Sequence, residues 1–176
     1  TEKLGSSAAH AYGHNICMSE TYANSGWDLT LQEMKAVADW QYVRGINMMV
    51  PHAFYYSIEG DRMWECPPSQ FFQNPYWKYL NLYSDYMRRL GYMLSRGHHV
   101  AHVAVYYPEV SGWRHLTPDD ERKVDEIDQV FKELSYSLLE AQLDFDYLDD
   151  DTLWERARVE DGCIRVFDES YKAIVI

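Results

Sequence analysis

Apolar and polar residues follow one another in blocks that predict helices and short buried strands in alternation. Residues 6–12 have the character of the end of a helix, and Gly13 fits the left-handed cap that closes one. The mostly apolar run 14–19 then predicts a short strand buried on both faces, with Glu20 at its end. The chain thus opens with a helix followed by a strand that ends in a carboxylate.

A second helix and strand follow the first pair. Thr30 with Glu33 fits a capping box, which predicts that a helix begins there, and Gly45 ends it. The apolar residues of this helix share one face: Leu31, Met34, Val37, Ala38 and Tyr42. A second buried strand is predicted at 46–50, and it leads to His52 just as the first strand leads to its glutamate.

The stretch 57–74 has no periodic pattern and contains one glycine and two prolines, so we predict a long loop. Helical spacing returns at 75–96, and Gly97 ends this helix. The order so far is helix, strand, helix, strand, loop, helix. Parallel barrels and doubly wound sheets both give this alternation, so the pattern predicts an α/β fold without choosing between them.

The pattern changes at Gly97, where a second series of strands and helices begins. The predicted elements are a strand at 99–107, a loop at 108–116, a helix capped by Thr117 and running to about Gln142, a strand at 145–148, a short helix at 151–158, a small strand at 162–166 and a strand at 173–176. We expect this series to form a sheet of its own. Because no helix follows the last strand, we expect the chain to be an excerpt of a longer protein.

The amino-acid composition excludes some classes of binding partner. Among 176 residues, 28 are acidic and 16 are basic, and the formal charge of −12 would repel a phosphate backbone, so we exclude nucleic acid. The apolar runs are far shorter than the roughly 20 residues that cross a bilayer, so we expect no membrane span. The three cysteines have no zinc or redox spacing. The compartment stays open, with the periplasm or the exterior as candidates for the full-length protein.

Glu20 and His52 are the strongest candidates for chemistry because each ends a predicted strand. In a parallel barrel the C-terminal strand ends form the mouth that holds the active site. Cleavage of a glycosidic bond needs two carboxyl groups, and Glu20 could act as the nucleophile or as the base that activates water. His52 could orient Glu20 or bind a sugar hydroxyl. The alternative is structural, with a carboxylate that bonds loop amides and a histidine that caps its strand.

Aromatic residues suggest how a sugar could be held. The chain has 15 Tyr and 6 Trp, and aromatic rings stack on the apolar faces of sugars. Tyr55 and Tyr56 follow His52 and would border the same mouth, and Trp27 and Trp64 lie in loops where they could form a sugar platform. The alternative for any one of them is a bulky core residue.

Metal and cofactor sites receive little support from the sequence. His10 and His14 are four residues apart, but Gly13 intervenes and no acidic residue completes a zinc motif. Phosphate-binding, dinucleotide-binding and serine-hydrolase motifs are absent, so we expect neither a metal nor a cofactor. We interpret the remaining groups as structural histidines (His98, His99, His102) and as a solvated strand-to-helix turn (Asp144, Asp146, Asp149, Asp150, Asp151).

The chain also resembles a known family over essentially its whole length. The residues that carry the resemblance are Ser6 to His10, Gly13, the Glu20 strand, Trp27, Asp39-Trp40, Gly45 to Asn47, His52, Phe71, Trp77, Asp85-Tyr86, Arg89-Leu90, Gly97 and Val103 to Pro108. They look like the last third of a large glycoside hydrolase barrel. The resemblance is to the α-L-rhamnosidase-like group, glycoside hydrolase family 106, with relatives among the β-galactosidase-like enzymes.

This resemblance implies a fold and a set of roles. Residues 1–97 would be the C-terminal part of a (β/α)8 barrel, and residues 98–176 would begin a parallel-sheet domain of the flavodoxin-like or amidotransferase-like type, through which the protein could form a homo-oligomer. Glu20 would follow the seventh barrel strand as nucleophile or base. The proton donor would lie upstream of Thr1, so we expect this excerpt alone to be inactive.

We therefore predict a glycoside hydrolase that acts on oligo- or polysaccharides. The alternative is a non-catalytic carbohydrate-binding or assembly module that keeps the barrel without turnover. A signalling domain at 98–176 is disfavoured, because the acidic residues of its pocket are not at successive strand ends.

Overall fold

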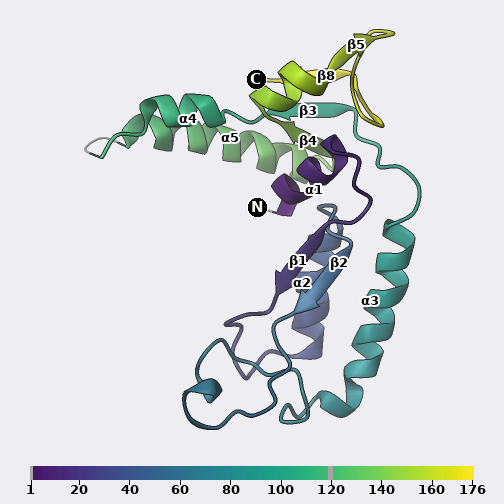
Figure 1. The fold of residues 1–176 in the computed structure, drawn as a ribbon, viewed down its shortest axis with the longest axis vertical. Coiled ribbons are helices and arrows are strands. Elements are labelled where there is room, and N and C mark those ends of the chain that lie inside the picture. The colour runs from purple at the N-terminus through teal and green to yellow at the C-terminus, as the bar shows by residue number, and fades with distance from the viewer. Residues whose placement is uncertain (1, 119–120) are drawn as a thin grey trace. The chain divides into compact units, whose positions relative to one another are not determined.

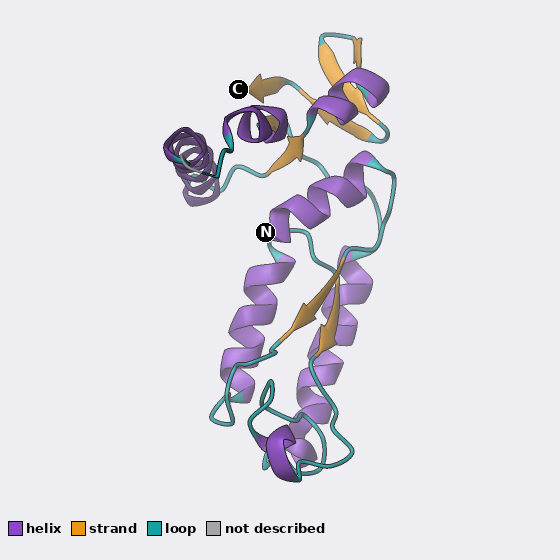
Figure 2. Cartoon of the chain, turned by 60° about the vertical axis from the view of Figure 1, so that its left-hand side comes forward, coloured by secondary structure: helices purple, strands orange, loops and turns teal. Residues whose placement is uncertain are grey.

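The computed structural model describes residues 2–118 and 121–176, and it has an α/β fold (Figures 1 and 2). Contacts divide the chain into two compact units, one made of Lys3–His14 with His98–Ile176 and the other of Asn15–Gly97. The first helix thus packs with the later residues, although the sequence analysis placed it in a domain at 1–97. A domain boundary at residue 97 stays a prediction. Among the described residues, no helix combines the length and apolar character needed to cross a membrane.

The unit Asn15–Gly97 is built on two parallel strands, β1 (Met18–Thr21) and β2 (Met48–Pro51). Helix α2 (Leu31–Tyr42) connects them, which is the crossover that a parallel pair requires. The register pairs Glu20 with Val50, so the two strands end side by side. The alternation predicted for this part of the chain is confirmed.

The start of α2 shows how local sequence sets an element. The Thr30 hydroxyl accepts the backbone N–H of Glu33 at 3.2 Å, and the Glu33 carboxylate accepts the Thr30 N–H at 2.8 Å. The predicted capping box is confirmed. The hydrogen bonds from the backbone and then the hydroxyl of Thr30 lower the pKa of Glu33.

Replacing Thr30 by alanine should destabilise α2. Loss of a capping hydroxyl costs about 1 kcal/mol, so the free energy of unfolding should fall by about that amount. Chemical denaturation followed by circular dichroism measures it. Thr30→Ser keeps the oxygen and should cost far less, so equal losses in the two variants would contradict a capping role.

The two-stranded sheet is less covered than predicted. Both strands were expected to be buried on two faces, but Met18, Met48 and Val50 are exposed. The reason is that among the described residues this sheet has only two strands, so the described residues leave part of its apolar surface open.

The remainder of this unit is a long loop and a helix. The loop contains one short 3-10 helix, η1 (Gly60–Met63), and a second one, η2 (Trp77–Tyr79), leads into α3 (Leu80–Leu94). The predicted helix at 75–96 is therefore confirmed in its main part. The core residues of this unit come from the loop after β1, from α2 and from α3: Tyr22, Leu29, Met34, Leu80 and Tyr83.

Tyr22 ties the loop after β1 to both helices. Its hydroxyl donates to the Met34 carbonyl at 2.8 Å and lies 2.5 Å from the Tyr83 hydroxyl. Burial raises the pKa of Tyr22 to about 12, although its bond to Tyr83 opposes that rise. Because the Tyr22 hydroxyl serves two buried partners, it stabilises the region just beyond Glu20.

Tyr22→Phe should therefore cost more stability than Tyr83→Phe. Removing the Tyr22 hydroxyl leaves the Tyr83 hydroxyl without this buried partner, a loss of about 1–3 kcal/mol. Tyr83→Phe leaves Tyr22 its bond to Met34. Denaturant titrations of both variants test the order, and a larger loss in Tyr83→Phe would contradict this account.

The unit of Lys3–His14 and His98–Ile176 contains a parallel sheet of order β4-β3-β8, formed by β4 (Phe145–Leu148), β3 (Val103–Tyr106) and β8 (Ala173–Val175). The predicted separate sheet is confirmed. Helix α1 (Glu2–Ala11) belongs to this unit, and it ends at Gly13, whose φ of +71° is the predicted left-handed cap. A Cβ at Gly13 would lie 2.3 Å from the Phe167 ring, so glycine is required there for space as well.

A small antiparallel sheet completes this unit. Its strands are β5 (Arg158–Glu160), β6 (Cys163–Val166) and β7 (Glu169–Tyr171), in that order. The core of the unit joins residues of α1 and of both sheets: Ala11, Ala101, Ala104, Leu148, Val166 and Tyr171.

Three predictions for this unit need correction. The predicted loop at 108–116 contains helix α4 (Glu109–His115), whose acidic first turn and basic last turn suit the helix dipole. Helix α5 (Arg122–Glu140) has Glu121 at its N-cap, so Thr117 does not cap it; residues 119 and 120 of the predicted helix lie outside the described residues. The predicted short helix is the π-helical η3 (Thr152–Arg156).

Candidate functional site

The structure brings Glu20 and His52 together at the C-terminal ends of adjacent parallel strands. Glu20 lies in β1 opposite Val50, and the backbone N–H of His52 donates to the Thr21 carbonyl at 2.8 Å, just beyond the end of β2. The His52 Nε2 atom is 3.8 Å from the Glu20 Oε1 atom. The two side chains are therefore neighbours, close enough for one to influence the other.

The two groups differ in their surroundings. The Glu20 side chain is 64% exposed, whereas that of His52 is 26% exposed. The His52 Nδ1 atom is buried and has no hydrogen-bond partner among the described residues. The Tyr55 ring meets the His52 ring edge-on, with centroids 6.0 Å apart. His52 is thus partly enclosed by protein on one side and open toward the carboxylate on the other.

The predicted aromatic residues fall into two groups. The Tyr55 hydroxyl donates to the carbonyls of Glu65 and Cys66, and the Trp27 Nε1–H donates to the Met63 carbonyl at 2.7 Å. Burial, followed by the nearby negative groups of the loop, raises the pKa of Tyr55. Both side chains are engaged by the long loop. Tyr56 and Trp64, by contrast, are exposed, with exposed fractions of 91% and 76%. Trp64 directly follows Met63, whose carbonyl accepts the Trp27 Nε1–H.

A comparison with protein-family models shows the family of this chain. The model of the α-L-rhamnosidases, glycoside hydrolase family 106, matches residues 1–176. The chain belongs to glycoside hydrolase family 106.

Two further proteins are similar to this chain. A rhamnosidase from Novosphingobium sp. PP1Y has a similar structure, with a TM-score of 0.69, 18% identity and 96% of this chain covered. A Formosa agariphila protein provisionally named a beta-glucuronidase is 28% identical over 119 residues, or 62% of this chain. The chain spans 16% of the first protein and 10% of the second.

A set of buried polar residues in the family 106 chain was missed by the sequence analysis. Ser69 is fully buried and its hydroxyl accepts the backbone N–H of Tyr55, while the Gln73 amide donates to the Tyr55 carbonyl at 2.9 Å. The backbone N–H of Gln70 donates to the Ala53 carbonyl at 2.7 Å. These bonds fix the segment after His52 against the end of the long loop. Polar residues directly after two prolines are a signal of such a fixed turn, which the sequence analysis did not use.

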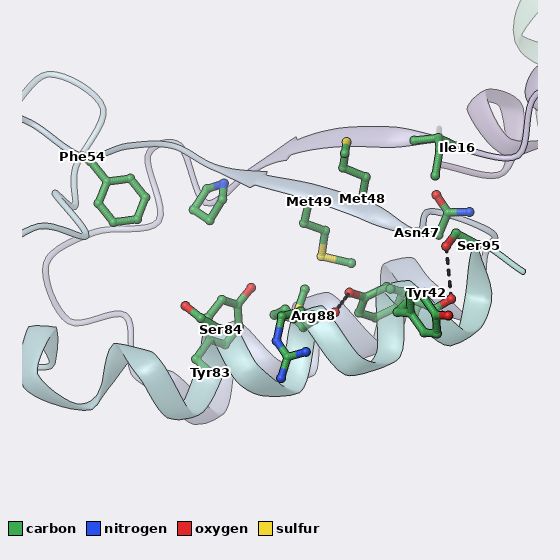
Figure 3. Close-up of a pocket in the computed structure, with 14 residues that line it drawn as sticks. Ile16, Tyr42, Asn47, Met48, Met49, Phe54, Tyr83, Ser84, Arg88 and Ser95 are labelled. Atoms are coloured by element: carbon green, nitrogen blue, oxygen red, sulfur yellow. Dashed lines mark hydrogen bonds between the residues drawn. The ribbon is translucent and has the colours of Figure 1, made fainter.

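The described pocket of this unit lies elsewhere. It has a volume of about 430 Å³, and most of its lining comes from β2 and α3, with Met49 on β2 and Arg88 on α3; Phe54 lies at one end (Figure 3). Neither Glu20 nor His52 lines it. Its lining is mainly apolar and includes neither Asp nor Glu, which indicates a packing surface of the unit rather than a place for glycosidic chemistry.

Proposed function

We propose that the protein containing this chain hydrolyses O-glycosidic bonds, with Glu20 as nucleophile or general base. The observation that carries the proposal is the Glu20–His52 pair at the ends of adjacent parallel strands, in a chain of a glycoside hydrolase family. Glycosidic cleavage takes two carboxyl groups. In this proposal the proton donor lies upstream of Thr1, as the family resemblance implies. An exposed carboxylate beside a histidine is open to a sugar and to water.

His52 acts in this proposal as a positioning residue for Glu20. Its Nδ1 atom is buried without a partner among the described residues, so we assign the proton of the neutral ring to Nε2. That N–H then faces the Glu20 carboxylate across 3.8 Å. A short movement of either side chain makes a hydrogen bond, which orients the carboxylate.

We further propose that β1 and β2 are neighbouring strands of a (β/α)8 barrel and that residues 98–176 begin a flavodoxin-like domain. The parallel pairing with α2 as the crossover supports the barrel. So do the exposed apolar residues of the two strands, because parallel sheets in such folds are covered on both faces. The parallel order β4-β3-β8 supports the second domain, whose role in homo-oligomer formation is part of the same proposal.

The family description and the Novosphingobium relative favour an α-L-rhamnoside as substrate, whereas the name of the Formosa relative favours a β-glucuronide. Initial rates of the full-length protein on the aryl α-L-rhamnoside and on the aryl β-D-glucuronide separate the two. We expect turnover of the rhamnoside. Turnover of neither sugar, with binding detected by saturation-transfer NMR, would contradict hydrolysis and support the carbohydrate-binding alternative.

Trp64→Ala should weaken substrate binding and leave the chemical step intact. An aromatic contact contributes about 0.5–1.5 kcal/mol, so KM should rise several-fold, up to about tenfold, with little change in kcat. Trp154 is a matched control because it is 86% exposed and lies in the other unit, on η3. An unchanged KM in Trp64→Ala would remove this residue from the proposed sugar platform.

A further inference from the structure

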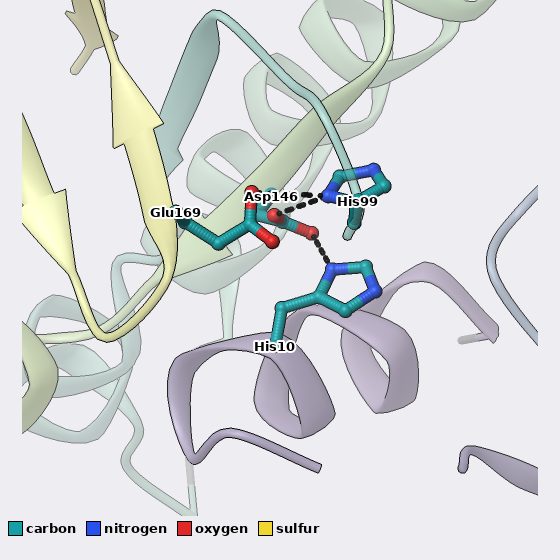
Figure 4. A group of neighbouring side chains, drawn as sticks. All are labelled: His10, His99, Asp146 and Glu169. Carbon is teal, nitrogen blue, oxygen red and sulfur yellow. Dashed lines mark hydrogen bonds and ion pairs between the residues drawn. The ribbon is translucent and has the colours of Figure 1, made fainter. Parts of the chain in front are cut away.

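Four metal-ligating side chains converge within the unit that contains residues 98–176 (Figure 4). They are His10 on α1, His99 ahead of β3, Asp146 on β4 and Glu169 on β7. Their ligand atoms all lie within 4.8 Å of one another. Asp146 is fully buried and Glu169 nearly so, which corrects the expectation that Asp146 belongs to a solvated turn.

The separations within this four-residue cluster are close to those of a tetrahedral site. The His10 Nδ1 atom is 2.9 Å from Asp146 Oδ1, and the His99 Nδ1 atom is 3.4 Å from Asp146 Oδ2 and 3.2 Å from Glu169 Oε2. Ligands that bind zinc tetrahedrally at about 2.0–2.1 Å lie about 3.3 Å apart. These separations involve both Asp146 oxygens, and the four ligand atoms together lie within 4.8 Å of one another, so the side chains must close in to surround one ion.

A second carboxylate holds one histidine in the orientation that a metal requires. The His99 Nε2 atom is 2.8 Å from Asp144 Oδ2, so Asp144 accepts the Nε2–H and leaves Nδ1 facing the cluster. Lys3 in turn holds Asp144 through a 2.6 Å ion pair. A carboxylate on the remote nitrogen of a ligating histidine is the usual support of zinc sites.

The charges also favour a dication. Asp144, Asp146 and Glu169 bring three negative charges, and Lys3, which lies 3.8 Å from Asp146, brings one positive charge. A ligating imidazole has to be neutral, so an ion that binds here releases any proton held on the ligating nitrogens, and two negative charges then remain at the site. A single divalent ion balances them, and zinc is a metal that accepts both imidazole and carboxylate ligands.

We propose that His10, His99, Asp146 and Glu169 bind a zinc ion that fixes helix α1 to strands β4 and β7. The two imidazole rings stack with centroids 4.0 Å apart and planes at 18°. An ion in the plane of both rings requires a wider angle between them. Binding therefore requires the His10 ring to rotate, and its side chain, at 15% exposed, lies closer to solvent than that of Asp146.

Zinc titration of the chelator-treated full-length protein by calorimetry tests this site. The wild-type protein should bind one equivalent that is lost or weakened at least tenfold in His10→Gln and Glu169→Gln. Asp144→Asn should weaken it by about 10–100-fold, as expected for a residue that orients a ligand. His14→Gln is the matched control, because His14 is exposed and outside the cluster. The zinc affinity of this variant should equal that of the wild-type protein.

A second measurement does not depend on the folding of any variant. Crystals of the wild-type protein soaked in zinc chloride should give an anomalous difference peak between His10, His99 and the Asp146 carboxylate. A peak only at other positions, no zinc uptake by the wild type, or equal affinity in the His10→Gln and His14→Gln variants would each overturn the proposal.

Discussion

Glu20→Gln should lower the kcat of the full-length protein by about 10²–10⁴-fold, the range that a positioned acid or base contributes. The amide has nearly the shape of the carboxylate but can neither attack a sugar carbon nor take a proton from water. Because the Glu20 side chain is 64% exposed, the replacement should leave the fold intact. Initial rates on the aryl rhamnoside measure the loss, and saturation-transfer NMR should still detect bound sugar.

The matched control for this variant is Glu140→Gln, a charge loss on an exposed residue at the end of α5. It should keep the wild-type kcat. The kcat of His52→Gln should lie between those of Glu20→Gln and Glu140→Gln. If His52 orients the carboxylate, this variant should also shift the pH profile of kcat. Wild-type turnover in Glu20→Gln would exclude Glu20 as a catalytic residue.

Asp146→Ala should be the most destabilising replacement in the other unit. Asp146 accepts the Tyr171 hydroxyl at 2.9 Å and the His10 Nδ1–H at 2.9 Å, and it lies 3.8 Å from the Lys3 ammonium. Burial would raise the pKa of Asp146, but the bonds to His10 and His99 and the charge of Lys3 hold it well below its usual range. Removing one partner of a buried ion pair costs about 3–5 kcal/mol.

The experiment is a denaturant titration with a chelator present, so that any metal contribution is absent from both proteins. Asp151→Ala is the control, because this exposed neighbour in the same acidic stretch should change stability by less than about 0.5 kcal/mol. Equal stability of Asp146→Ala and the wild type would show that the buried cluster does not hold the unit together.

The sequence predicted those features whose signals are local. The capping box at Thr30 and the left-handed Gly13 depend on residues within one turn, and β4 at Phe145–Leu148 is a short segment in which Asp146 is the one charged residue. The neighbouring ends of β1 and β2 followed from the alternation of strands and helices. The roles assigned to Glu20, His52, Trp27, Tyr55, Tyr56 and Trp64 stay predictions.

What the sequence did not predict depends on contacts between distant residues. His10 and Asp146 are separated by 136 positions, and nothing near either residue shows that they pair. The sequence analysis considered His10 with His14, His99 with its neighbouring histidines, and Asp146 within an acidic stretch, and assigned none of them to a metal site. Only the packing of α1 beside β4 and β7 makes them one cluster. Helix α4 was missed for a different reason, because its seven residues are too few for a periodic pattern.

The unit of Lys3–His14 and His98–Ile176 is made of two separate segments of the chain, which has a consequence for folding during synthesis on the ribosome. Helix α1 belongs with residues that follow Gly97, so the helix emerges long before the strands that hold it. The entropy cost of closing so long a loop grows only slowly with its length, but the delay in time is unavoidable. The unit Asn15–Gly97 therefore leaves the ribosome before the strands that hold α1, and α1, a ten-residue helix too short to be stable by itself, must wait for β4.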